Sequence, residues 1–356
     1  QYSLSIKDAN DVLRMAESDR SLQSFYAEAL RIKGLNSYRL GESRNAVEYL
    51  ERSLSIYKQL NEPGSVSLLL SETAMVHAAI GNAGIAKNLY RESLIRLRIE
   101  KNLYIQSDTL NNLAVLHLQL GEYELAASTF EEGLECARVS RNLRTEALIL
   151  VGLGDLYSEV EEFDAATLAY DQAETIASNV SGFFVSNYLK LARANLSLLQ
   201  RNKEFANDLL NQFQKKLRIN PSNYERGLWA LLEGRYHLLI GEYKKAVNYL
   251  NDAKSCFLQD GRESECQWSR IWLIATFAQA GMQERARLEF ASLLESTDKS
   301  NHALLIAMHQ AAPWLMQLQS DPEIGKMLSS MFERAKQFGE RIPANRRALR
   351  RLAQSI

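Results

Sequence analysis

The sequence predicts an all-α protein, an α-solenoid of stacked helical hairpins with seven clear repeats and degenerate caps. Apolar residues recur every three or four positions, as at Leu113, Leu116 and Leu120, and no stretch alternates with the period of two that a strand requires. Three of the five prolines stand where this helical periodicity breaks. The third observation is an internal repeat of 40 residues, which indicates one structural unit used many times.

Each repeat is marked by a turn position, most often glycine, and by an alanine five residues later. The turn positions are Gly41, Gly81, Gly121, Glu161, Arg201, Gly241 and Gly281. The alanines are Ala46, Ala86, Ala126, Ala166, Ala206, Ala246 and Ala286. Since alanine is roughly one residue in ten, seven in register have a chance probability of about 10⁻⁷. The repeat is therefore not a coincidence of composition.

The glycine and the alanine each have a physical reason to stand where they do. Glycine just past a helix end adopts the left-handed cap at no steric cost, and a small alanine lets two helices approach closely. Each unit is thus predicted to be a hairpin. Its first helices are expected near 65–80, 104–120, 143–159, 183–200, 223–239 and 262–280, and its second helices near 83–98, 123–139, 162–178, 203–218, 242–258 and 282–296.

The pattern decays at both ends, as expected of caps that meet water on one side. Residues 1–20 are predicted to hold an N-terminal capping helix, and residues 21–300 form the repeats. Residues 301–340 are predicted to be a degenerate capping hairpin, with Pro313 inside its first helix. Residues 341–356 carry five arginines and no acid, and we expect a basic linker to a further C-terminal module.

Composition argues against several classes of function. The 42 basic and 43 acidic side chains give a net charge of −1, so there is no global basic field for nucleic acid. No apolar run reaches the 18 or so residues of a membrane span, and residues 1–20 lack a signal-peptide core. The cysteines Cys136, Cys256 and Cys266 form no CxxC pair, so we expect buried thiols. A soluble, cytoplasmic protein with no membrane partner is predicted.

Catalytic and metal-binding motifs are missing from the sequence. It contains no P-loop, no HExxH and no zinc-type cluster of Cys and His, so we expect no enzyme, no cofactor and no metal. His77, His117 and His237 share one register, where a packing role is expected. His302 and His309 are seven residues apart without a third ligand, and packing is expected there too.

The unit at 147–180 resembles the tetratricopeptide repeat. Its matching residues are Leu153, Gly154, Tyr157, Ala166, Tyr170 and Ala173. With a period of 40 where the standard repeat has 34, segments such as 113–126 resemble the superhelix of large bacterial transcription activators. These are relatives of the maltose-regulon activator and regulators with a bacterial transcriptional activator domain. The resemblance implies a right-handed solenoid that receives an inducer and contacts flanking domains of its own chain, with DNA bound only through a module outside this segment.

In that family the first helix of each hairpin lines a concave groove. The residues that match groove positions here are Arg31, Tyr38, Asn111, Asp155, Tyr188, Asn195, Arg235 and Trp268. Rings and polar groups together suit a peptide, a protein segment or a small-molecule inducer such as an oligosaccharide. We therefore expect a non-catalytic sensor domain of a multidomain bacterial transcription regulator. A free-standing peptide-binding or protein-binding scaffold, and a regulatory solenoid attached to an enzyme, remain alternatives.

Overall fold

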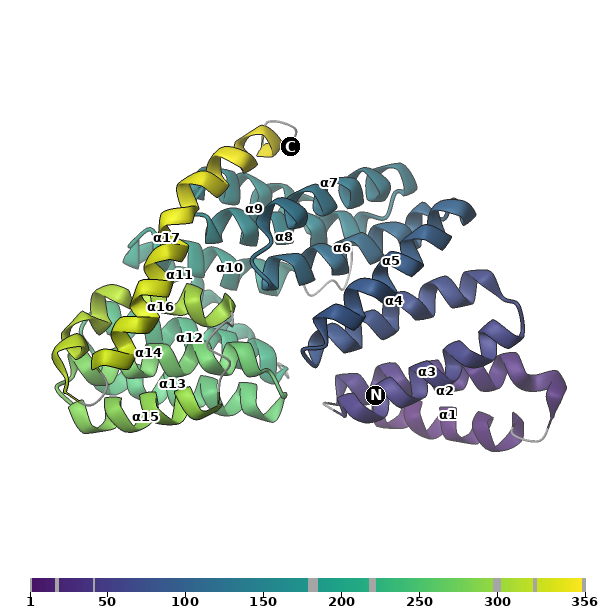
Figure 1. Ribbon diagram of the computed structural model, residues 1–356, viewed down its shortest axis with the longest axis horizontal. Helices are drawn as coiled ribbons and strands as arrows, with labels where there is room; N and C mark the ends of the chain where they lie inside the picture. Colours follow the sequence, from purple (N-terminus) through teal and green to yellow (C-terminus); the bar gives the residue numbers. More distant parts are fainter. Residues whose placement is uncertain are drawn as a thin grey trace. The chain divides into compact units, whose positions relative to one another are not determined.

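The computed structural model describes residues 2–16, 19–40, 42–178, 185–217, 222–296, 302–322 and 325–353, and helices take up nearly all of them (Figure 1). These residues contain no β-strand. The all-α prediction is confirmed, and the helices follow one another in hairpins whose predicted bounds lie within a few residues of the observed ones.

We call the first helix of each hairpin an A helix and the second a B helix. The A helices are α2 (Gln23–Arg39), α4 (Pro63–Ala79), α6 (Leu103–Gln119), α8 (Leu143–Glu159), α10 (Val185–Leu199), α12 (Asn223–Leu239) and α14 (Glu263–Gln279). The B helices are α3 (Ser43–Gln59), α5 (Ala83–Glu100), α7 (Tyr123–Ser140), α9 (Phe163–Ser178), α11 (Lys203–Lys216), α13 (Tyr243–Gln259) and α15 (Gln283–Ser296). Before them come α1 (Tyr2–Ala16) and the 3₁₀ turn η1 (Arg20–Leu22), and after them α16 (His302–Leu315), the 3₁₀ turn η2 (Met316–Ser320) and α17 (Gly325–Ala353).

Each described turn after an A helix ends on a residue with a left-handed backbone. The predicted turn residue Gly41 lies outside the described residues. Gly81, Gly121, Gly241 and Gly281 have φ values of +84°, +72°, +80° and +73°, which confirms the prediction made for them. The turns between repeats that the structure describes use the same conformation, at Asn61, Lys101, Arg141 and Gly261.

Two turns adopt this conformation without glycine. Glu161 and Arg201 have φ values of +59° and +60°, although a side chain there costs about 1–2 kcal/mol. The hydrogen bonds of the motif are kept, since the N–H of Glu162 donates to the carbonyl of Tyr157 at 2.8 Å. The helix packing therefore imposes the turn geometry, and glycine only makes it easier.

The seven repeat alanines are all fully buried, as the close approach of A and B helices requires. Two A-helix glycines show how close the approach is. A Cβ atom on Gly154 would lie 2.3 Å from Cε1 of Tyr170, and one on Gly234 would lie 2.5 Å from Cγ of Leu250. Any larger residue at these two positions would push the hairpin apart.

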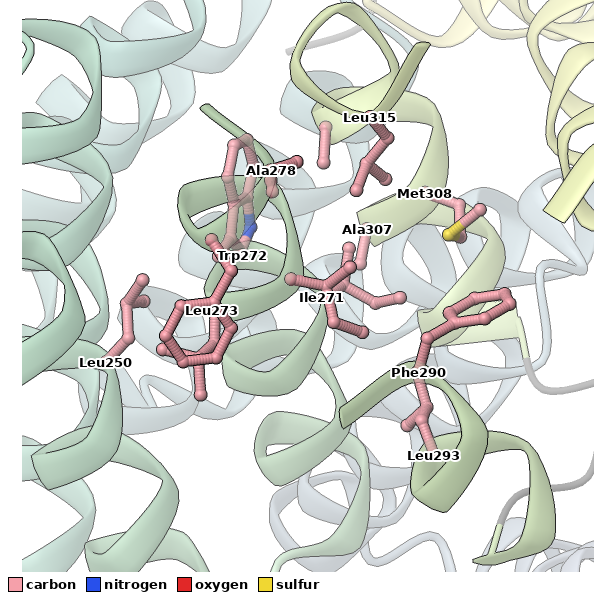
Figure 2. Packing of buried hydrophobic residues seen from close by; sticks show 14 of the residues in the cluster. Leu250, Ile271, Trp272, Leu273, Ala278, Phe290, Leu293, Ala307, Met308 and Leu315 are labelled. Atoms are coloured by element: carbon pink, nitrogen blue, oxygen red, sulfur yellow. The ribbon is translucent and has the colours of Figure 1, made fainter. Parts of the chain in front are cut away.

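The chain divides into two compact units. The first comprises Gln1–His117 with Ser128–Ile149, and the second comprises Leu118–Ala127 with Leu150–Ile356. A core of the first unit surrounds Leu50, Leu69 and Leu70 of α3 and α4, each of them 0% exposed. In the second unit, a large core joins Leu250, Ile271 and Trp272 to Phe290 and Leu315 (Figure 2).

The C-terminal end differs from the expectation of a linker after residue 340. Helix α17 continues through Pro343 to Ala353, and its apolar residues Ile342 and Leu349 are buried. The five arginines and Pro343 conceal this apolar stripe in the sequence, and burial of the stripe keeps the segment helical. Although α17 has 29 residues, neither it nor any other described helix is both long and apolar enough to cross a membrane.

Candidate functional site

Three predicted groove residues of the second unit share one register. Asp155, Asn195 and Arg235 are 40 residues apart and lie on the successive A helices α8, α10 and α12. Nη1 of Arg235 donates a hydrogen bond to Oδ1 of Asn195, so two of the three residues touch directly. We call Asp155, Asn195 and Arg235 the polar row.

Asp155 is held by two phenols. The hydroxyl of Tyr170 donates to Oδ1 at 2.7 Å, and the hydroxyl of Tyr188 donates to Oδ2 at 2.9 Å. The ring of Tyr170 reaches Asp155 from α9 because Gly154 leaves room for it. Burial raises the pKa of Asp155 to about 7, and the two phenolic hydrogen bonds only partly offset this rise. The structure thus joins two predicted site residues, Asp155 and Tyr188.

Arg235 is buried, with 5% of its surface exposed. Its guanidinium stacks over the ring of Trp272, with its carbon 4.5 Å from the ring centroid, and its described hydrogen-bond partner is the neutral amide of Asn195. Among the described residues no carboxylate is paired with it, and burial lowers its pKa to about 10. A buried charge usually has an acidic partner, so Arg235 differs from most buried arginines in the neighbours that the structure describes for it.

Trp272 was not identified from the sequence, although it lies close to both Arg235 and a second indole. Its ring meets the ring of Trp314 edge to face, with centroids 5.6 Å apart. Its Nε1 atom is buried without an acceptor among the described residues. Trp272 comes one helical turn after Trp268, so helical spacing from a predicted site residue was the available signal.

Trp268 itself is used inside the fold. Its Nε1 donates to the carbonyl of Ala303 at 2.6 Å, and the indole packs against the core of the second unit. It therefore ties α14 to α16. Its indole N–H already has an acceptor in Ala303, in contrast to that of Trp272.

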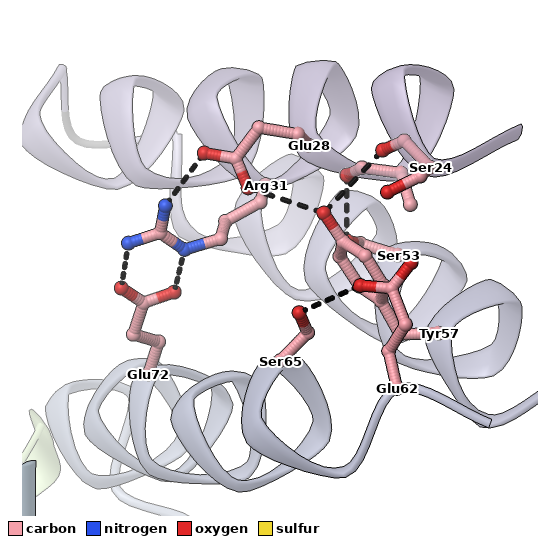
Figure 3. Close-up of polar contacts among 9 residues, drawn as sticks. Ser24, Glu28, Arg31, Ser53, Tyr57, Glu62, Ser65 and Glu72 are labelled. Atoms are coloured by element: carbon pink, nitrogen blue, oxygen red, sulfur yellow. Dashed lines mark hydrogen bonds and ion pairs between the residues drawn. The ribbon is translucent and has the colours of Figure 1, made fainter. Parts of the chain in front are cut away.

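In the first unit, Arg31 has two acidic partners. Its Nε and Nη2 donate to the two carboxylate oxygens of Glu72 at 2.6 and 2.5 Å, and its Nη1 donates to Glu28 at 2.7 Å (Figure 3). Burial would lower the pKa of Arg31, but Glu72 and Glu28 outweigh burial and raise it. Tyr57 also donates to Glu28, at 3.3 Å. The charge of Arg31 is therefore neutralised within the fold.

The other two predicted groove residues of the first unit, Tyr38 and Asn111, differ in how they are contacted. Tyr38 is half-buried and packs against the core around Leu50. Asn111 is 9% exposed and its amide nitrogen donates to Asn112 at 3.4 Å, but its Oδ1 has no donor among the described residues. Asn111 is thus the predicted residue of this unit with hydrogen-bonding capacity left over.

The histidines of the repeats and the three cysteines each pack individually against other side chains of the fold. His77 and His117 are buried, and His237 stacks on Tyr249 with ring centroids 5.3 Å apart, in agreement with packing roles. All three cysteines are free, two of them buried and Cys256 half-buried. Within the described part of the chain, no three His, Cys, Asp or Glu side chains are grouped so that they could hold a metal ion.

Comparison with known proteins agrees with this architecture. Residues 106–179 match the tetratricopeptide repeat family. A solved Rap protein, complexed with Competence and Sporulation Factor, aligns with a TM-score of 0.63 at 13% identity, covering 91% of this chain and 100% of that one. A tetratricopeptide repeat protein from Parabacteroides merdae aligns with a TM-score of 0.51 at 16% identity, covering 79% of this chain and 98% of that one. No curated protein matches the sequence. The fold is therefore a helical-repeat solenoid of the tetratricopeptide type.

Proposed function

We propose that this chain is a non-catalytic binding solenoid that holds a peptide or protein segment by an acidic group docked on Arg235. The observation that carries the proposal is the buried guanidinium of Arg235, which has an amide and an indole beside it but no described carboxylate. A carboxylate accepts two parallel hydrogen bonds from arginine, and such charge-assisted bonds are about twice as strong as neutral ones. An acidic ligand would therefore supply the missing opposite charge.

The other residues of the polar row, Asn195 and Asp155, would contact an extended ligand along successive A helices. Asn195 offers an amide beside Arg235, and Asp155 with Tyr188 offers an acid and a phenol one repeat earlier. An extended peptide has amide groups along its whole length, which suits such side chains on successive helices. The Rap protein solved with Competence and Sporulation Factor supports the idea that a solenoid of this fold can hold a bound factor.

The finer part of the proposal is that the solenoid is the sensor domain of a larger bacterial transcription regulator in the cytoplasm. The likeness of segment 113–126 to the repeats of such regulators supports it. A ligand could switch the regulator only through different affinities for two arrangements of the solenoid. The sequence of the full-length gene tests this part. A DNA-binding module would support it, a flanking catalytic domain would favour the enzyme-linked alternative, and no further domain would favour a free-standing scaffold.

The binding site is tested by a thermal-shift screen against short peptides, maltose-type oligosaccharides and nucleotides. A ligand at 100 times its dissociation constant adds about 2.7 kcal/mol of stability, so a hit is visible whichever class of compound binds. We expect hits among peptides with an acidic side chain or a free carboxyl terminus, and amidated copies of the peptides distinguish these two sources.

The variant Arg235→Gln should weaken peptide binding by roughly tenfold or more, because a charged hydrogen-bond partner is lost. Arg226→Gln, at an exposed arginine on the same helix α12, is the matched control and should bind as wild type. Hits confined to oligosaccharides or nucleotides, or equal peptide binding by both variants, would contradict the proposal.

A further inference from the structure

The last two helices return to turns far earlier in the sequence, all within the second unit. The hydroxyl of Tyr123, at the start of α7, lies 3.0 Å from Nε2 of His302 at the start of α16. The ring of Phe338 on α17 meets the rings of His302 and Tyr123, with centroids 5.4 and 6.5 Å away. The contact between Tyr123 and His302 joins residues 179 positions apart, so it results from the folding of the unit.

Gly121 allows this contact to form. A Cβ atom on Gly121 would lie 2.6 Å from both Cε1 and Nδ1 of His302, and its φ of +72° also favours glycine. The same residue therefore ends α6 and makes room for the imidazole of His302. Substitution at Gly121 should disturb both.

The acidic groups at this junction already have partners. Glu161 accepts a hydrogen bond from Arg346 and lies 3.5 Å from Nε2 of His309. Glu159 accepts from the hydroxyl of Tyr123 at 3.1 Å and lies 3.8 Å from Nε2 of His302. Nε of Arg346 also donates to the carbonyl of Val160 at 2.6 Å, which holds α17 to the turn after α8.

Beside these contacts lies a cavity of about 420 Å³ whose lining is rich in cationic and polar groups. It is lined by Arg334 and Arg341 of α17, by the amide side chains of Gln337 and Asn345, and by His302. Arg334 is half-buried and Arg341 is exposed, and neither has an acidic partner among the described residues. The cavity volume falls within the range of small-molecule sites, about 300–1,000 Å³.

We propose that this cavity binds a small metabolite that carries a phosphate group, with Arg334 and Arg341 as the groups that hold the anion. The guanidinium fork matches phosphate oxygens, and two arginines seven residues apart can hold a dianion or two linked phosphates. Gln337 and Asn345 supply further hydrogen bonds. Because the cavity has walls from both α17 and the turn at Gly121, the ligand binds the unit with α17 docked and stabilises that state.

The proposed phosphate site is tested by calorimetric titration and thermal shift of the full chain with inorganic phosphate, pyrophosphate, ATP and adenosine. We expect pyrophosphate or ATP to bind and to raise the melting temperature, and adenosine alone to do neither. The variant with both Arg334→Gln and Arg341→Gln should bind roughly tenfold to a hundredfold more weakly. The matched control with Arg226→Gln and Arg285→Gln removes two exposed charges elsewhere and should bind as wild type.

Two further variants keep the result interpretable. Replacing Arg334 and Arg341 with lysine retains the charges and should retain part of the binding, even where the glutamine variant folds poorly. Gly121→Ala leaves both arginines in place but crowds His302, and should also weaken binding. No binding of any phosphate compound at millimolar concentration would overturn the proposal, and so would an equal loss of binding in the Arg226 and Arg285 control.

Discussion

The two units treat buried charge in opposite ways. In the first unit, the guanidinium of Arg31 faces two carboxylates, and the A helices α2 and α4 are joined by this ion pair. In the second unit, Arg235 meets an amide and an indole, and Asp155 meets two phenols. The first arrangement is complete without a ligand. In the second, a buried cation and a partly buried acid each lack an opposite charge among the described residues, which is a state that binding can relieve.

The largest effect is expected at Asp155, where the contrast predicts a dependence of stability on pH. Its pKa in the folded state is about 7, well above the usual value of 3.8. As pH rises from about 4 to 7, the unfolded chain releases this proton first, so folding becomes less favourable. At about 1.4 kcal/mol for each pH unit between the two pKa values, the loss is on the order of 4 kcal/mol.

The variant Asp155→Asn should remove this loss, so its stability relative to wild type should rise between pH 4 and pH 7. Urea unfolding across this range measures the difference, and Asp164→Asn, at an exposed position on α9, is the control. A difference between Asp155→Asn and wild type that does not change with pH would mean that Asp155 is compensated by a charge after all.

The second effect tests the first unit. The variant Arg31→Met removes the cation that is hydrogen-bonded to Glu72, whose side chain is only 15% exposed, and should lower the free energy of unfolding by about 2–3 kcal/mol. The double variant with Glu72→Met should recover most of this loss, because both charges are then gone. Arg98→Met breaks a pair whose side chains are 53% and 41% exposed, and should cost less than about 1 kcal/mol. Chemical denaturation that ranks Arg98 above Arg31 would refute this account of the first unit.

The repeat register explains why much of the fold was predictable and much of the site was not. Helix bounds follow from apolar periodicity and from turn residues every 40 positions, both of which are local signals. Contacts between neighbouring A helices also follow the register, since Asn195 meets Arg235 after 40 residues and Arg31 meets Glu72 after 41. The register therefore predicts which A-helix positions meet. It does not predict the contacts of Asp155 with Tyr170 or of Arg235 with Trp272, which span 15 and 37 residues.

The C-terminal helix was harder to predict for a physical reason. Pro343 removes one helical hydrogen bond, and the surrounding arginines suggest a solvated segment. The stability of α17 here comes from Ile342 and Leu349, which are buried, and from the bond of Arg346 to the carbonyl of Val160. Such long-range contacts leave no periodic signal over so short a segment. The cavity beside α17 depends on the same contacts and was missed with them.

The smallest expected effect on stability is at Arg235, and it tests the contrast most directly. The variant Arg235→Met is destabilised by the loss of a stacking contact worth about 0.5–2 kcal/mol and by the unused acceptor left on Asn195. It is stabilised by the removal of a buried charge that has no opposite partner among the described residues. These terms oppose each other, so we expect the free energy of unfolding to change by less than about 1 kcal/mol. Arg31→Met, measured in the same denaturation series, should cost several times more. If the two substitutions cost the same, Arg235 is as much a part of the folded framework as Arg31, and the site for an acidic ligand must be sought elsewhere on the A helices.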